Sequence, residues 1–130
     1  MHLIDNLIAD VRFKEVLQSC PKLISLDLSQ TTEWSPYFDA IPGKVYELDV
    51  SKCSWLEDRL LGTLTGLVPN VSILSLAQNT QLTYKGFALL KGFRALRGLS
   101  LARCSQLDGE SLSLIIQGAP SLSELDLAGC

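Results

Sequence analysis

The six residues 125–130, LDLAGC, nearly repeat LSLARC at 99–104, and the repetition runs through most of the chain. The shared pattern is L-x-x-L-x-L-x-x-[CNT], with Val also found at leucine positions. Self-similarity at a fixed period near 25 residues is typical of repeat architectures, so it constrains the fold more than any local pattern. The middle leucines follow one another at steps of 22, 26, 25 and 26 residues. The pattern predicts five strand motifs, at 23–31, 45–53, 71–79, 96–104 and 122–130.

A second pattern, with a period nearer four, lies between the matches. Its apolar members are Leu56, Leu61 and Leu64, then Leu82, Phe87 and Leu90, then Leu107, Leu112, Ile115 and Ile116. Such spacing predicts short amphipathic helices. Pro69 and Pro120 end two of them, because proline cannot continue the helical hydrogen bonds. Alternating strands and helices at this period predict an α/β fold, with a parallel sheet backed by a row of helices.

The N-terminal third departs from the regular repeat. Residues 1–20 fit only its second half, with Ile8, Phe13, Val16 and Leu17 at the apolar positions, and are predicted to form an N-terminal capping helix or half repeat. The connection TTEWSPYFDAIPGK at 31–44 has two prolines and a glycine that leave no room for a regular helix. We expect its aromatic residues to replace that helix with bulk, the alternative being an exposed patch for a partner; they are Trp34, Tyr37 and Phe38.

This repeat resembles the leucine-rich repeat family, in its cysteine-containing class typical of F-box substrate receptors. The class repeats C-x-x-L-x-x-L-x-L-x-x-C-x-x-[IL]-[TD]-D-x-x-L-x-x-[LI]-[AI], and residues 96–119 are similar to it nearly position for position. The resemblance implies a single domain over 1–130, a right-handed β-α solenoid with its sheet on the concave face and its helices on the convex face. It also implies substrate recognition for a ubiquitin ligase. The ribonuclease-inhibitor-like class stays as an alternative because Asn79 stands between cysteines in the repeat.

Composition and motifs narrow the classes of function. Hydrophobic residues make up 47% of the 130 residues and charged residues 19%, which is typical of a globular chain, and the net charge of -3 disfavours nucleic acid as a partner. His2 is the only histidine, so no Ser/His or Cys/His nucleophile is expected, and no phosphate-binding glycine motif occurs. We therefore expect no enzymatic activity and no cofactor. No segment is apolar enough for a membrane or a signal peptide, so the expected location is cytoplasmic or nuclear.

Four cysteines are present, without a C-x-x-C pair, so no metal site is expected. Three of them, Cys53, Cys104 and Cys130, share one position of the repeat, which Thr31 and Asn79 occupy elsewhere. All these side chains are small and form hydrogen bonds. We interpret them as a buried ladder that satisfies polar backbone groups where the chain bends after each strand.

Alternate strand residues point away from the leucine core, so the repeat predicts an exposed sheet face. We expect a partner protein to bind this face, with acidic groups on either side of a smooth middle suited to an apolar contact with basic ends. The alternative is that these polar residues only keep the exposed sheet face hydrated and bind no partner. The candidate residues are Asp27, Glu47, Asp49, Ile73, Ser75, Arg97, Ser100, Arg103, Glu124 and Asp126.

The chain ends on a strand motif, which predicts a fragment of a longer solenoid or an edge that another chain covers. Self-association through Leu122, Leu125 and Leu127 is expected. The sequence thus favours a non-catalytic protein-binding scaffold. Two alternatives remain: a structural or assembly subunit that uses this C-terminal edge, and an immune or pathogen-effector repeat protein.

Overall fold

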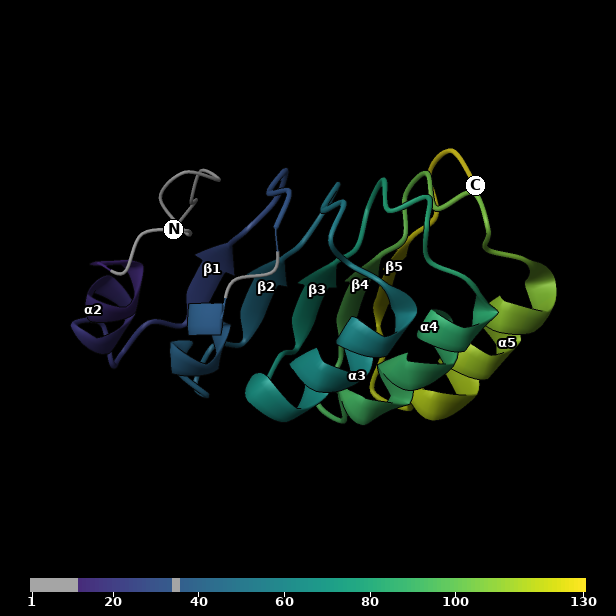
Figure 1. Cartoon of the computed structure of the whole chain (residues 1–130). Coiled ribbons are helices and arrows are strands. Elements are labelled where there is room, and N and C mark those ends of the chain that lie inside the picture. The colour runs from purple at the N-terminus through teal and green to yellow at the C-terminus, as the bar shows by residue number, and fades with distance from the viewer. Residues whose placement is uncertain (1–11, 34–35) are drawn as a thin grey trace.

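The computed structural model describes residues 12–33 and 36–130, which form a five-stranded parallel sheet with helices in its connections (Figure 1). The strands lie in chain order, so each pairs with the strands before and after it in sequence. The predicted α/β class is confirmed. With η marking a 3₁₀-helix, the elements are α2 (Arg12–Gln18), β1 (Ser25–Asp27), η1 (Pro36–Ala40), β2 (Glu47–Asp49), α3 (Asp58–Leu67), β3 (Ile73–Ser75), α4 (Tyr84–Ala88), η2 (Leu89–Gly92), β4 (Gly98–Ser100), α5 (Gly109–Gly118) and β5 (Glu124–Asp126).

Equivalent positions of the repeat meet across the sheet. The middle leucines pair in one continuous row, in the order Leu26, Leu48, Leu74, Leu99 and Leu125. Each strand is three residues long and lies inside one of the five motif ranges. Because side chains alternate along a strand, this register sends the leucines to one face and their two neighbours to the other.

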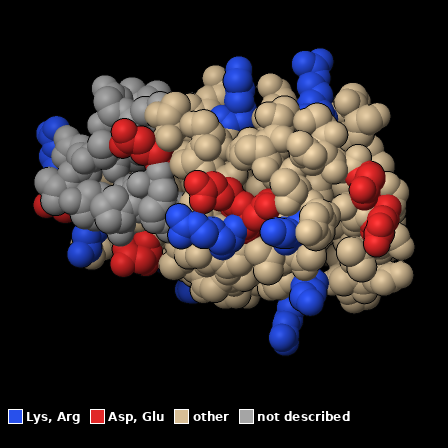
Figure 2. Space-filling view, turned by 45° about the vertical axis from the view of Figure 1, so that its right-hand side comes forward, with Lys and Arg blue, Asp and Glu red and all other residues tan. Residues whose placement is uncertain are grey.

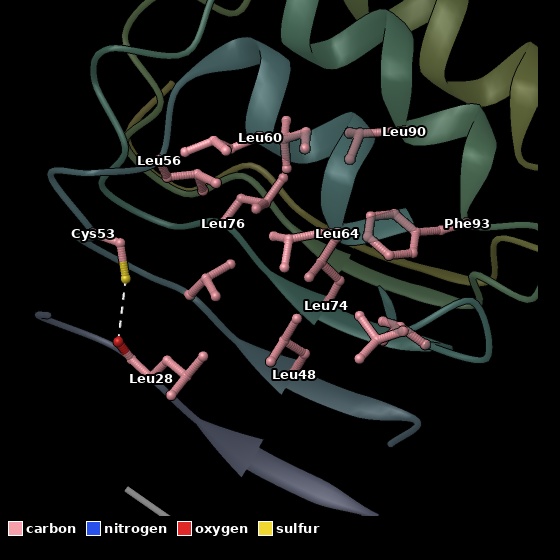
Figure 3. Close-up of a cluster of buried hydrophobic side chains, with 14 of the residues drawn as sticks. Leu28, Leu48, Cys53, Leu56, Leu60, Leu64, Leu74, Leu76, Leu90 and Phe93 are labelled. Carbon is pink, nitrogen blue, oxygen red and sulfur yellow. Dashed lines mark hydrogen bonds between the residues drawn. The ribbon is translucent and has the colours of Figure 1, made fainter. Parts of the chain in front are cut away.

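Helices α3, α4 and α5 lie side by side over the leucine face of the sheet (Figure 1). Leucines of β2 and β3 point toward those of the helices in Figure 3, and Leu48, Leu64, Leu74 and Leu90 are each at most 1% exposed. Burying such a side chain stabilises the folded state by about 1.5–3 kcal/mol. The apolar positions predicted after Cys53 and Asn79 are all buried, so those predictions are confirmed.

The connection from β1 to β2 contains the 3₁₀-helix η1 in place of an α-helix, as its prolines predict. Phe38 on η1 is fully buried, with its ring centroid 6.1 Å from that of Phe13 on α2 and 5.5 Å from that of Trp55. Aromatic bulk therefore fills this region, as expected for Phe38. Trp34 and the side chain of Tyr37 lie outside the described residues.

Two predicted core positions are wrong. Ile116 on α5 is 51% exposed and Val16 on α2 is 40% exposed, whereas their neighbours Ile115 and Leu17 are buried. Successive helix residues point about 100° apart, so when one of two adjacent residues points directly at the sheet the other lies at the margin of the buried face. The expected N-terminal helix is observed as Arg12–Gln18, and its remaining residues, including Ile8, lie outside the described part of the chain.

A left-handed residue follows each strand. The backbone φ there is 62° at Gln30, 50° at Lys52, 62° at Gln78, 58° at Arg103 and 75° at Gly129. The N–H of each of the first four donates to a carbonyl of the next unit, at 2.8–2.9 Å, so the pairing between units continues into the turn. Left-handed backbone favours glycine, and the sequence shows that preference only at the last of the five turns.

Candidate functional site

The face of the sheet opposite the helices presents two rows of side chains that cross all five strands. The first row is Ser25, Glu47, Ile73, Gly98 and Glu124. The second row is Asp27, Asp49, Ser75, Ser100 and Asp126. Five of these ten residues are acidic and none is basic, so the face carries negative charge.

Side chains of the second row have a structural task. One carboxylate oxygen of Asp27 accepts a hydrogen bond from the N–H of Ser29 at 2.8 Å, and Asp49 and Asp126 do the same for Ser51 and Ala128, at 2.9 and 3.0 Å. Aspartate commonly stabilises a turn in this way. Asp residues therefore stabilise three of the five turns, and the second oxygen of Asp126 also accepts a hydrogen bond from the Ser100 hydroxyl at 3.2 Å.

Charged groups of the first row make no such contacts. The carboxylates of Glu47 and Glu124 take part in no hydrogen bond or ion pair within residues 12–33 and 36–130, although the backbone N–H of each donates to a neighbouring carbonyl. Glu47 is exposed on β2 and Glu124 is exposed on β5. Their carboxylates are thus available to a ligand.

Between these two glutamates the face is hollowed and apolar. Ile73 is 39% exposed, and Gly98 beside it has no side chain. A Cβ atom placed on Gly98 would lie 3.8 Å from the Ile73 side chain and 3.8 Å from the Glu124 carboxylate, which is ordinary van der Waals contact. We call this gap the Gly98 notch. It lies within a hollow of about 340 Å³ lined by β2 to β5, the sheet-face hollow.

The structure brings together seven of the ten candidate residues around the sheet-face hollow: Glu47, Asp49, Ile73, Ser75, Ser100, Glu124 and Asp126. Asp27 lies on β1, outside its lining. Arg97 precedes β4, and its Nε donates to the Ser72 hydroxyl at 3.3 Å. Arg103 lies on a turn, where it and Lys52 line a separate hollow of about 410 Å³. The basic candidates are therefore not part of the acidic hollow.

The shared Thr/Cys/Asn position forms hydrogen bonds at every bend. The Sγ atoms of Cys53, Cys104 and Cys130 donate to the carbonyls of Leu28, Leu76 and Leu101 in the preceding unit, at 3.2, 3.3 and 3.1 Å (Figure 3 shows the first). Asn79 at the same position donates to Val50 and Leu76 carbonyls, each at 2.9 Å. Thr31 donates to the Leu28 carbonyl at 2.8 Å. The expected hydrogen-bonding ladder is observed.

Burial raises the pKa of the Cys53 and Cys104 thiols above the usual value. A thiol held protonated is a poor nucleophile, so these two cysteines have the chemistry of scaffold residues. The prediction of a buried ladder is wrong for Cys130, which is exposed. Its strand, β5, pairs with β4 alone in the described sheet.

Two supporting side chains are not recognisable from the repeat pattern. The indole Nε1 of Trp55 donates to the Thr31 hydroxyl at 2.8 Å, and the Gln81 amide donates to the carbonyls of Cys53 and Leu56 at 2.9 and 2.7 Å. Both residues lie two positions beyond the ladder position. A polar or aromatic side chain at that fixed offset is the signal that could have revealed them.

The helix side of the molecule carries charges of both signs, including Asp58 and Arg59 on α3 and Lys85 on α4. At the centre of the view in Figure 2, acidic and basic side chains lie next to one another, with uncharged surface around them. One exposed pair, Arg59 Nε and Glu57 Oε2, lies 3.1 Å apart. Mixed charges of this kind are typical of solvated surface, whereas the sheet-face rows carry one sign only.

No family model matches the sequence. In the described ranges no group of three or more His, Cys, Asp or Glu side chains is arranged to hold a metal ion. Among the same residues, no helix has the length and apolar character needed to cross a membrane. Of the three leucines predicted to support self-association, Leu125 is 36% exposed, while Leu122 and Leu127 pack partly against the core.

Proposed function

We propose that this chain is a leucine-rich repeat solenoid of the cysteine-containing class, and that it binds a partner protein through the two sheet-face rows without catalysing a reaction. The repeat assignment is supported by the register, because each middle leucine pairs with the middle leucine of the next unit. It is supported again by the ladder position, where Thr, Cys and Asn perform the same task at successive bends.

One observation carries the binding role. The sheet-face hollow exposes the apolar Ile73 side chain between two glutamates whose carboxylates have no partner in the described part of the chain. A concave apolar surface with a few polar groups at its margin is typical of binding sites.

The resemblance to F-box receptors supports a more specific form of this proposal. The bound protein is then a substrate presented to a ubiquitin ligase, in the cytoplasm or the nucleus. The sheet face would supply recognition, and the ligase would be assembled through other components.

A peptide-display selection tests the binding role. The full chain is used to select peptides from a random library, and the affinity of selected peptides is measured by fluorescence anisotropy for wild type, Ile73→Lys and Ile116→Lys. The two variants change net charge equally and replace the same residue type, on the sheet face and on α5. We expect Ile73→Lys to weaken binding at least about tenfold, the loss of one buried apolar contact, with little change for Ile116→Lys.

Circular dichroism and thermal unfolding check that both variants fold. Selected peptides that bind Ile73→Lys as well as wild type, or that are lost in Ile116→Lys instead, would show that the sheet face is not the binding surface.

A further inference from the structure

We infer that the sheet face takes an extended segment of the partner with one apolar side chain between two basic side chains four positions apart. This inference rests on the proposed function and adds the chemistry and spacing of the bound segment. Three features of the first row carry it: the Gly98 notch, the carboxylates on either side, and the distance between them.

The Gly98 notch sets the place of the apolar side chain. The side chains of Ile73 and Glu124 lie on either side of Gly98 and cover its backbone, so Gly98 is buried, and its missing Cβ leaves a shallow gap between them. A glycine inside a strand weakens the sheet, since it offers no side chain for packing. Its presence here is explained if another molecule fills the gap with an aliphatic side chain.

Charge determines what lies on the two sides of that apolar residue. On one side the hollow is lined by Glu47 and Asp49, and on the other by Glu124 and Asp126. No Lys or Arg belongs to either row. A ligand with Lys or Arg at both ends would complement each acidic pair, whereas acidic ends would be repelled.

The strand order sets the spacing. Glu47 and Glu124 are separated by three strand steps, from β2 to β5, because Glu47, Ile73, Gly98 and Glu124 are register partners in turn. At about 4.8 Å per step this is about 14 Å. An extended segment advances about 3.3 Å per residue, so four residues cover that distance. A helix rises about 1.5 Å per residue and would need about nine.

The test uses the full chain and a synthetic probe, acetyl-Gly-Lys-Ser-Leu-Ser-Lys-Gly-amide, followed by shifts of backbone amide signals in NMR titration. We expect saturable shifts centred on Ile73 and Gly98 in dilute buffer, weaker in 0.5 M salt because screening reduces exposed ion pairs. Three comparison peptides should each bind at least about threefold more weakly: Glu in place of both Lys, Ser in place of Leu, and Lys residues nine positions apart. Absence of binding, or equal binding of the acidic peptide, overturns the inference.

Two sets of variants assign the effect to named groups. Glu47→Gln with Glu124→Gln removes the two glutamates that make no structural contact, and we expect about a 3- to 10-fold loss of affinity. Glu57→Gln with Glu110→Gln changes the net charge by the same amount at the starts of α3 and α5 and should change affinity less than twofold. Equal effects of the two pairs would mean that the net charge of the protein acts only at long range. That outcome would contradict binding of the segment to the first row.

Gly98→Ala adds one carbon atom to the notch without disturbing the sheet, because a Cβ there has only ordinary van der Waals contacts. We expect the variant to keep the thermal stability of wild type and to bind the leucine peptide at least about tenfold more weakly. Unchanged affinity would refute the notch. Library peptides that need Ile73 but carry no basic pair would refute this inference and leave the proposed function standing, whereas peptides indifferent to Ile73→Lys would refute both.

Discussion

Two successive connections of the sheet are built from different elements: the one from β1 to β2 and the one from β2 to β3. The first uses the 3₁₀-helix η1 and an aromatic cluster, and the second uses the regular helix α3. The strands on both sides nevertheless keep the same register. The difference teaches that register depends on the strand and its turn, and that the segment behind the sheet must supply apolar volume in any form that fits.

The largest effect should come from removing that volume in the aromatic connection. Phe38→Ala leaves a cavity next to Phe13 and Trp55, and we expect it to lower the free energy of unfolding by about 3–5 kcal/mol. Phe87→Ala, at the corresponding depth on α4, should cost a similar amount. Urea unfolding measures both.

Tyr84→Ala serves as the control for those measurements, because Tyr84 is 61% exposed and should change stability by less than about 0.5 kcal/mol. If Phe38→Ala cost no more than this control, η1 would be a loosely packed loop and the two connections would not be equivalent. The comparison would then fail at its first step.

The ladder position should give the next largest effect. Asn79 makes three buried hydrogen bonds, two to the carbonyls of Val50 and Leu76 and one from the N–H of Cys53 at 2.9 Å. Asn79→Ala removes the Asn79 partner of the Val50 carbonyl and of the Cys53 N–H, while the Leu76 carbonyl keeps its hydrogen bond from Cys104, and we expect a loss of about 2–3 kcal/mol in urea unfolding.

Asn79→Cys introduces the side chain that three other units use at this position and should lose less stability than Asn79→Ala. Equal losses of stability in the two variants would show that the hydrogen bond from a thiol at this position does not stabilise the fold. The ladder residues would then contribute only through packing. Either result sharpens the contrast between the parts of the unit that are repeated and the parts that vary.

Helices α3 and α4 are joined by a close contact. Asp58 accepts hydrogen bonds from the N–H and hydroxyl of Thr83, at 2.9 and 2.6 Å, and Gly86 lies against its carboxylate. A Cβ on Gly86 would collide with Asp58, so we expect Gly86→Ala to destabilise the protein by about 1–3 kcal/mol in urea unfolding.

Gly66→Ala is the matched control, because Gly66 lies within α3 with open space around its Cβ position. Alanine is the better helix former, so this change should stabilise the protein by about 0.5–1 kcal/mol. A neutral Gly86→Ala would contradict the contact between the helices, whereas a destabilising Gly66→Ala would show that an added methyl group is unfavourable in these helices even without a contact.

Much of the fold could be predicted because the same residue pattern occurs five times, and each occurrence has the same structural environment. The positions of Leu26, Leu48 and Leu74 in one row follow from their spacing alone. The spacing does not say which of two adjacent apolar helix residues faces the sheet, so Ile116 and Val16 were misplaced. The left-handed backbone at Lys52 and Arg103 could not be predicted from the sequence. Hydrogen bonds to the next unit hold these residues in a conformation that they do not prefer locally.

The candidate site was only partly accessible to the same reasoning. Row membership follows from alternation along each strand, which placed Glu47 and Ile73 side by side. Separation of Arg103 from the acidic hollow depends on the direction of the turn, which is set in three dimensions. The notch at Gly98 needs the neighbouring side chains of Ile73 and Glu124, which no pattern within one repeat can supply.

The smallest effect should appear only at alkaline pH, and it separates the units that carry a thiol from the first unit, which carries Thr31. Burial raises the pKa of Cys53 and Cys104, so the folded protein keeps both thiols protonated where the unfolded chain, with a usual pKa of 9.0, begins to lose its protons. Unfolding then releases protons, and stability falls as pH rises above about 9, by at most about 1.4 kcal/mol per pH unit for each thiol. Below that range the contribution is fully present and constant.

Urea unfolding of wild type and of the Cys53→Thr, Cys104→Thr double variant between pH 7 and pH 10.5 measures this difference. Threonine at the ladder position does not ionise, and the exposed Cys130 stays in both proteins, so the variant should lose stability less steeply above pH 9. Parallel curves would mean that the two thiols ionise as readily in the folded protein as in the unfolded chain. Burial would then not protect them, and the thiol-bearing units would be as insensitive to pH as the unit that carries threonine.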